Sequence, residues 1–231
     1  MRSFLMMGLA FLVLGAFVGT ASADWSDDFE SYAPGSGLHG QGGWHGWDGN
    51  PAADAYISAS YSHSPSNSVA IAAASDMVHE FSGYTSGVNT FTAWQYIPSD
   101  FSGITYCILL NQYQDGGPYN WSTQVSFDSG SMLVISDPQG ATLPLIMGQW
   151  IELQLVIDLD ANTQTFYYNG TMLFTKSWTE GLSGGGTLNI AALDLFANGA
   201  SPVYYDDVSL MIQHPTPVVS TSWGRVKGLF R

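Results

Sequence analysis

Short runs of alternating or continuously apolar residues recur along the whole chain. They are rich in Val, Ile, Thr, Tyr and Phe, and clusters of Gly, Asn, Asp, Ser and Pro separate them. About a dozen such runs occur, among them NTFTAWQYI, ITYCILLNQY, WIELQLVIDL and VYYDDVSLMI, and no long segment has the period of an amphipathic helix. This pattern predicts an all-β fold, a two-sheet antiparallel β-sandwich with jelly-roll topology.

The N-terminus has the pattern of a secretory signal peptide. Residues 1–23 begin with a basic residue, Arg2, continue with an apolar run, and end with small residues at Ala21 and Ala23. The apolar run is short for a membrane span, and the cleavage pattern follows it at once. We therefore expect a secreted protein, extracellular or at the cell surface, that is cleaved near Ala23 and has no membrane span in the mature chain.

The C-terminus reads as a linker followed by a tag. Prolines and small polar residues over 214–222 predict a linker that ends the domain over 24–213. Residues 223–231 form a short basic amphipathic segment, which resembles terminal tags on secreted proteins of some Gram-negative bacteria. We interpret it as a sorting or envelope-docking tag, and the alternative is a disordered end with incidental charge.

Charge narrows the range of partners. The chain has 19 acidic residues against five Lys and Arg, and Lys176 is the only Lys or Arg between positions 24 and 213. Such a domain repels phosphate backbones, so we expect no nucleic-acid partner. The single cysteine, Cys107, lies in an apolar run and is expected to be buried in the core rather than reactive.

Several segments resemble a known superfamily. In QWIELQLVIDLDANTQTFYYNGTMLF, turns at 160–162 and at Asn169-Gly170 predict a three-stranded meander. This segment resembles strands of the concanavalin A-like lectin/glucanase superfamily, and the pairing of DDFE with YYDDVSL is similar to the ends of LamG-like and carbohydrate-binding-module-like jelly rolls of secreted bacterial proteins. The resemblance implies first and last strands that run side by side at one edge, where several such modules hold a structural calcium.

The double aspartate in the last strand led us to predict a calcium site. Strict alternation places Asp206 on the apolar face of the strand, where a carboxylate is costly without a partner. The implied strand pairing brings Asp28 and Glu30 beside Asp206 and Asp207, and calcium accepts such a set of oxygen ligands. The alternative is that these carboxylates accept hydrogen bonds from backbone amides.

The sequence argues against catalysis. Glycosidases of this superfamily carry an E-x-D-x-E motif, and none of the four glutamates in this chain begins one. We therefore predict that the protein is not an enzyme. A glycoside hydrolase or lyase with a carboxylate pair from distant segments, such as Asp115 with Asp194, remains an alternative.

Two loops have the residue types of a sugar site, namely aromatic rings beside polar groups. One loop carries Trp44 and Trp47. The other carries Asn111, Tyr113, Asp115, Tyr119 and Trp121. We predict a non-catalytic carbohydrate-binding or cell-surface module with a polysaccharide or glycan partner. The alternatives are that both tryptophans of the first loop plug the sandwich, and that the domain is a structural or adhesive surface protein without a small ligand.

Overall fold

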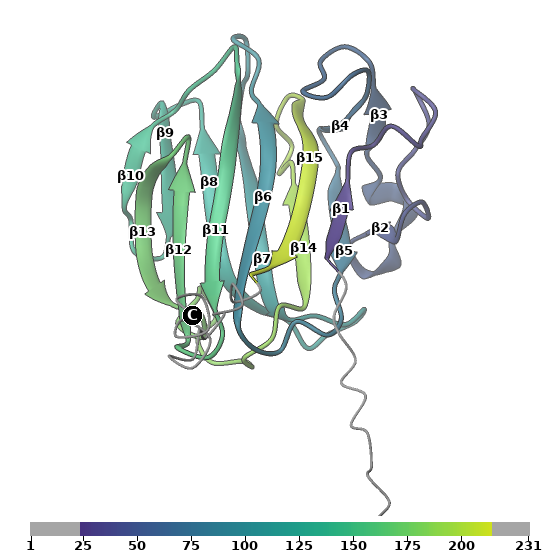
Figure 1. The fold of residues 1–231 in the computed structure, drawn as a ribbon. Coiled ribbons are helices and arrows are strands. Elements are labelled where there is room, and N and C mark those ends of the chain that lie inside the picture. The colour runs from purple at the N-terminus through teal and green to yellow at the C-terminus, as the bar shows by residue number, and fades with distance from the viewer. Residues whose placement is uncertain (1–23, 214–231) are drawn as a thin grey trace, which may run out of the picture.

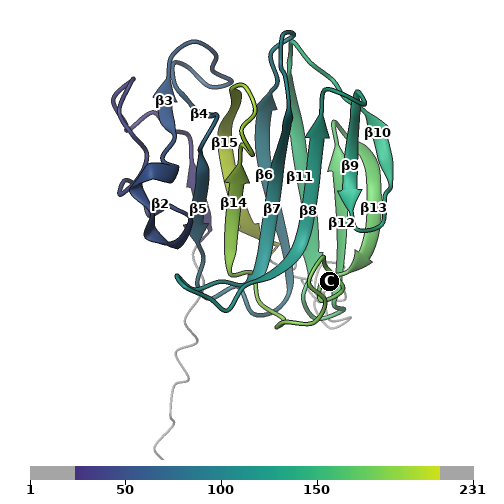
Figure 2. The same ribbon diagram turned by 180° about the vertical axis from the view of Figure 1, so that it is seen from behind.

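The computed structural model describes residues 24–213, so the predicted signal peptide, linker and tag lie outside the described residues. Two antiparallel sheets pack face to face in a jelly-roll β-sandwich, as predicted (Figures 1 and 2). Sheet A has eight strands and faces the viewer in Figure 1, and sheet B has seven strands and faces the viewer in Figure 2. Within residues 24–213, no helix has the length and apolar character needed to span a bilayer.

The strand order in each sheet is as follows. Sheet A runs β13 (Thr171–Ser177), β12 (Thr163–Tyr168), β11 (Trp150–Asp158), β6 (Val88–Tyr96), β15 (Val203–Ile212), β4 (Ser68–Ile71) and β3 (Tyr56–Ser58), and β1 (Trp25–Asp27) also pairs with β15. Sheet B runs β10 (Thr142–Pro144), β9 (Leu133–Asp137), β8 (Asn120–Asp128), β7 (Ile104–Gln112), β14 (Ala192–Phe196), β5 (Asp76–Glu80) and β2 (Trp44–Gly46). Two 3-10 turns, η1 (Trp47–Gly49) and η2 (Pro51–Ala53), follow β2.

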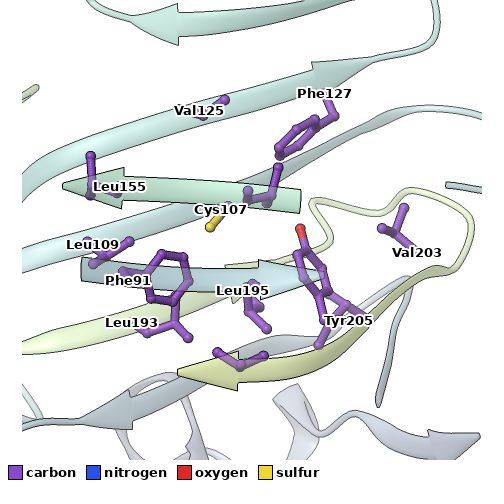
Figure 3. Packing of buried hydrophobic residues seen from close by; sticks show 14 of the residues in the cluster. Phe91, Cys107, Leu109, Val125, Phe127, Leu155, Leu193, Leu195, Val203 and Tyr205 are labelled. Atoms are coloured by element: carbon purple, nitrogen blue, oxygen red, sulfur yellow. The ribbon is translucent and has the colours of Figure 1, made fainter. Parts of the chain in front are cut away.

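The core lies between the inner faces of the two sheets. In β6 and β11, buried residues alternate with half-buried ones along the whole strand, as expected when one face of a strand packs inward. Phe91 of sheet A packs beside Leu109 and Leu193 of sheet B (Figure 3). Cys107 lies in the same core with no exposed surface, and burial raises the pKa of its thiol, so the prediction of a buried cysteine is confirmed.

The predicted meander is confirmed. β11, β12 and β13 pair in sequence order, and the second turn has positive φ at both Asn169 (49°) and Gly170 (73°). Two consecutive positive φ angles are what a type I′ hairpin requires, and Asn-Gly is the residue pair that adopts them most easily.

The first and last strands lie side by side, as the resemblance implied, but not at an edge. Trp25 of β1 is opposite Leu210 of β15, and β15 lies inside sheet A between β6 and β4. β15 pairs with β4 through Val203–Tyr205 and with β1 further along its length. A bulge at Asp206 and Asp207, with φ of 44° at Asp207, separates the two pairings.

The bulge corrects the predicted orientation of Asp206. Tyr205 before the bulge and Val208 after it are both fully buried in the core, so strict alternation fails between them. Asp206 is opposite Trp94, which is only half-buried, and therefore lies on the outer face of sheet A rather than with Val208 and Leu210.

Candidate functional site

A hollow of about 310 Å³ lies on the outer face of sheet B. We call it the aromatic pocket, because its walls include Trp47, Trp121 and Phe196. Its floor comes from β5, β7 and β14, which are neighbours in sheet B, and Gln124 of β8 also lines it. The surrounding outer face forms a second apolar cluster, separate from the sandwich core, that contains Val78, Ile108, Leu110 and Ala192.

Two carboxyl groups lie on this floor. Asp194 of β14 is opposite Val78, and Asp76 of the adjacent β5 is opposite Phe196, so the two aspartates are diagonal neighbours on one face. Their side chains share a hydrogen bond. Asp194 is only 3% exposed. Of the carboxylate pair given as an example from the sequence, Asp194 lines the pocket beside Asp76, whereas Asp115 is not among the lining residues.

The surroundings of the aspartate pair favour a protonated carboxyl group. Burial, followed by the charge and the hydrogen bond of Asp76, raises the pKa of Asp194 well above its ordinary value. Burial also raises the pKa of Asp76, while the hydrogen bond from Asp194 opposes that rise. Burial therefore favours the protonated form at Asp194, and the hydrogen bond to Asp194 favours the carboxylate form at Asp76. The Oδ1 atom of each residue is buried without a hydrogen-bond partner.

The walls of the pocket come from the two loops that the sequence singled out, and these loops lie against each other. The rings of Trp47 and Trp121 are nearly parallel, at 12°, with centroids 5.8 Å apart. The ring centroid of Tyr119 lies 4.8 Å from that of Trp47, and the ring centroid of Tyr113 lies 5.0 Å from it.

Hydrogen bonds fix the position of the Trp47 loop. The backbone N–H of Asp48 donates to the Tyr113 hydroxyl (3.1 Å), and the Asp48 carboxylate accepts from the Gly116 amide (2.9 Å) and from the Tyr119 hydroxyl. The Tyr119 hydrogen bond is the main cause of a lowered pKa at Asp48. The Tyr113 hydroxyl in turn donates to Asp115 (2.9 Å). Tyr113, Asp115 and Tyr119 thus hold the loop against the β7–β8 connection.

Two predicted ligand residues are structural instead. Trp44 is 1% exposed, packs in the sandwich core, and donates its indole N–H to Asp27 (2.9 Å). The predicted alternative of a plug is therefore correct for Trp44, whereas Trp47 lines the pocket. Asn111 is fully buried and donates its side-chain amide to Ser122 Oγ (2.8 Å) and to the Gly185 carbonyl (3.1 Å).

The loop between β13 and β14 closes one side of the pocket with Leu182 and Ser183. This loop lies directly on β8 at Gly181. A Cβ atom at Gly181 would overlap the Trp121 carbonyl oxygen and would lie 2.5 Å from the Ser122 Cα. Only glycine permits this close backbone approach.

A histidine and two carboxylates meet elsewhere on sheet B. His45 Nε2 lies 3.2 Å from Glu80 Oε1, and its Nδ1 lies 4.0 Å from Asp115 Oδ1. Among residues 24–213, this is the only set of three His, Cys, Asp or Glu side chains whose ligand atoms all lie within 4.8 Å of one another. Both carboxylates are half-exposed, and an ordinary ion-pair network accounts for the arrangement.

The double aspartate lies in sheet A and binds the loop between β3 and β4 of the same sheet. Asp206 accepts hydrogen bonds from the amides of His63 (2.7 Å), Ser64 (3.0 Å) and Asp207 (2.7 Å). Burial raises the pKa of Asp206 to about 6, and these amides oppose the rise. His63 Nδ1 lies 2.5 Å from Asp207, and its ring stacks on Trp94 with centroids 3.8 Å apart.

The remaining predicted calcium ligands also bind backbone amides. Glu30 accepts from Ser66 (3.1 Å) and Asn67 (2.7 Å), and Asp28 accepts from the Glu30 amide (3.1 Å). No three of the four predicted ligands, which include Asp206 and Asp207, bring their oxygens within 4.8 Å of one another. As they stand, these side chains do not form the converging oxygen shell that calcium needs.

Comparisons with known proteins support the fold. No family model and no curated protein matches the chain. A sialidase of known structure is similar at a TM-score of 0.56 and 9% identity, over 84% of this chain but 19% of that chain. A carbohydrate esterase from the Shiga toxin-encoding bacteriophage phi24B is similar at a TM-score of 0.50 and 13% identity, over 74% of this chain and 91% of that chain. A Trypanosoma rangeli sialidase is similar at a TM-score of 0.50 and 14% identity, over 71% of this chain and 28% of that chain. The chain therefore shares a β-sandwich fold with parts of these structures.

Proposed function

We propose that the domain is a carbohydrate-binding module whose ligand site is the aromatic pocket on the outer face of sheet B. The observation that carries the proposal is the joining of two indole walls to a buried carboxyl pair in one hollow of about 310 Å³. Sugar rings present C–H groups that pack on aromatic faces, and their hydroxyl groups donate to carboxylate oxygens. The pocket offers both kinds of contact within the span of one sugar ring.

The fold likeness adds a weaker argument. The similar solved structures include two sialidases and a carbohydrate esterase. A shared fold does not by itself transfer an activity or a ligand, so the pocket carries the proposal.

The proposed role is non-catalytic. Retaining glycosidases hold their two carboxyl groups about 5 Å apart, and inverting glycosidases hold them further apart to admit a water molecule. Asp76 and Asp194 are diagonal neighbours on adjacent strands and interact with each other, so they lie together on one side of the pocket rather than on opposite sides of a bound sugar. Their arrangement suits ligand binding better than glycoside hydrolysis.

Export from the cell and envelope docking through the C-terminal tag remain proposals from the sequence, as does a structural calcium. None of them is needed for the pocket to bind a glycan. An adhesive role is a second candidate because a row of aromatic rings covers part of the outer face of sheet A. Ring contacts of 3.8 to 5.9 Å join its members, Tyr204, Tyr61, Tyr96, Trp150, His63 and Trp94.

A glycan array with three proteins separates the two candidates. Trp121→Ala removes one wall of the aromatic pocket, and Trp150→Ala removes a half-buried tryptophan from the row on sheet A. The proposal predicts that the parent and Trp150→Ala bind the same glycans, and that Trp121→Ala loses them. Loss in Trp150→Ala alone would favour the adhesive face, and no binding by the parent would remove the proposed function.

A further inference from the structure

The aromatic pocket combines acidic groups with few hydrogen-bond donors. Asp76 and Asp194 are its two ionisable lining residues, and each has one buried, unpartnered oxygen. The Gln124 amide, which also lines the pocket, already donates to Asp137 (3.0 Å). The ionisable groups of the interior are therefore acidic and lie beside aromatic faces, and they favour a ligand group that donates hydrogen bonds and carries a positive charge.

The wider surface has the same sign of charge. Asp48 lies close enough to raise the pKa of Asp76 further by its charge. Lys176 is the only Lys or Arg in the described part of the chain, and it is bound at another edge of sheet B, where its ammonium group donates to the Asp137 carbonyl (3.2 Å). An anionic sugar would enter this pocket against uncompensated negative charge.

The pairing of two carboxyl groups indicates that the pocket lacks a cation to neutralise them. Two adjacent carboxyl groups hold a proton because both cannot ionise without a neighbouring cation. A ligand ammonium group could take the place of that proton, because it donates several hydrogen bonds and neutralises the pair. The indole faces of Trp47 and Trp121 would add cation–π attraction.

We propose that the pocket selects a glycan carrying a protonated amine, a deacetylated amino sugar, whose ammonium group binds between Asp76 and Asp194. This inference rests on the proposed function and narrows its ligand class. Binding would expel the shared proton to solvent, while the ligand keeps its own ammonium protons. Three other titratable groups interact with the pair. They are Asp48 near the pocket, and Cys107 and Tyr205 in the core.

Calorimetric titration with three matched probes tests this inference. The probes are short oligomers of glucosamine, of N-acetylglucosamine and of glucose, at an ionic strength of about 0.15 M, which screens general surface attraction. We expect the glucosamine oligomer to bind at least about tenfold more tightly than the two neutral oligomers, a difference of about 1.4 kcal/mol. Titrations in two buffers of different ionisation heat should show proton release for the glucosamine oligomer alone.

Asp76→Asn and Asp194→Asn should each remove most of the preference for the amine. Glu152→Gln is the control for general charge, since it removes one carboxylate on the other sheet. Melting curves identify any variant that does not fold, and either of the two aspartate variants suffices for the comparison.

Each other outcome overturns the inference in a distinguishable way. Equal binding of amine and neutral oligomers, lost in Trp121→Ala, would overturn the inference and keep the proposed function. An amine preference that falls equally in Glu152→Gln would reduce the effect to surface charge and overturn it. No binding of any oligomer would overturn both.

Discussion

Asp76 and Asp194 come from distant parts of the sequence and share one hydrogen bond on the floor of a pocket lined by Trp47 and Trp121. The relationship exists because β5 and β14 are neighbours in sheet B. It places two interacting carboxyl groups, one of them buried, in a pocket that a ligand can enter, and the predictions below begin from this pair.

The pair should make stability depend on pH. Burial raises the folded-state pKa of Asp194 above its unfolded value, so its contribution to stability is fully present below the unfolded value of about 3.9 and is lost as pH rises through the raised value. Asp194→Asn keeps the shape, can donate to Asp76 and cannot ionise. We expect the melting midpoint of this variant to increase relative to that of the parent as pH rises. A constant difference between the melting midpoints of Asp194→Asn and the parent would contradict the raised pKa of Asp194.

Asp206 should also make stability depend on pH, within a defined pH range. Its folded-state pKa is raised to about 6, so the stability it contributes should be lost between about pH 4 and pH 6 as pH rises. His79, whose pKa burial lowers to about 4, acts in the opposite direction, and comparison with Asp206→Asn cancels its effect. Across this pH window, we expect the free energy of unfolding of Asp206→Asn to increase relative to that of the parent by at most about 3 kcal/mol, as measured by urea unfolding. If the free energies of unfolding of the two proteins change with pH in parallel, burial does not raise the pKa of Asp206.

The close approach at Gly181 predicts a variant that damages the pocket. Gly181→Ala forces the β13–β14 loop away from Trp121 and Ser122, which should cost about 1 to 3 kcal/mol of stability and weaken ligand binding. Gly184 lies in the same loop with open space around it, although its φ is +67°. Gly184→Ala should therefore lower the melting midpoint slightly and leave ligand affinity unchanged. Equal affinities of Gly181→Ala and the parent would mean that the loop does not shape the site.

The calcium proposal predicts an effect of chelation. An ion that binds only the folded state, at about 100 times its dissociation constant, adds roughly 2.7 kcal/mol of stability. If the four carboxylates leave their backbone amides to bind calcium, removing the ion should lower the melting midpoint by roughly 5 to 11 °C, and magnesium should restore little of that loss. Coincident melting curves with and without chelator would leave Asp28, Glu30, Asp206 and Asp207 as acceptors of backbone amides alone.

The sequence predicted the fold and part of the site. Alternation and Asn-Gly turn chemistry are local signals, and they were sufficient for the sandwich, the meander and the buried Cys107. Loop composition likewise pointed to Trp47 and Trp121. What composition could not distinguish was a pocket wall from a core plug, as the buried Trp44 shows, because that depends on which way each loop folds back on its sheet.

The carboxyl pair was missed because it depends on long-range strand pairing. A signal for Asp194 was present, since it interrupts the apolar run ALDLF, just as Asp206 interrupts the last strand. Its partner Asp76 had no such signal. The orientation of Asp206 failed for a local reason, because one residue with positive φ, Asp207, shifts the alternation and turns Asp206 onto the outer face of sheet A.

The most direct test of the pocket is a titration followed by the indole N–H signals in ¹H–¹⁵N correlation spectra. The signals of Trp47 and Trp121 should move as a glucosamine or N-acetylglucosamine oligomer is added. Those of Trp44 and Trp178 should stay, because both indoles are buried and donate to Asp27 and to the Asn189 carbonyl. Movement confined to Trp94 and Trp150 would place the ligand on sheet A, and spectra that do not change with any oligomer would contradict a glycan site in the aromatic pocket.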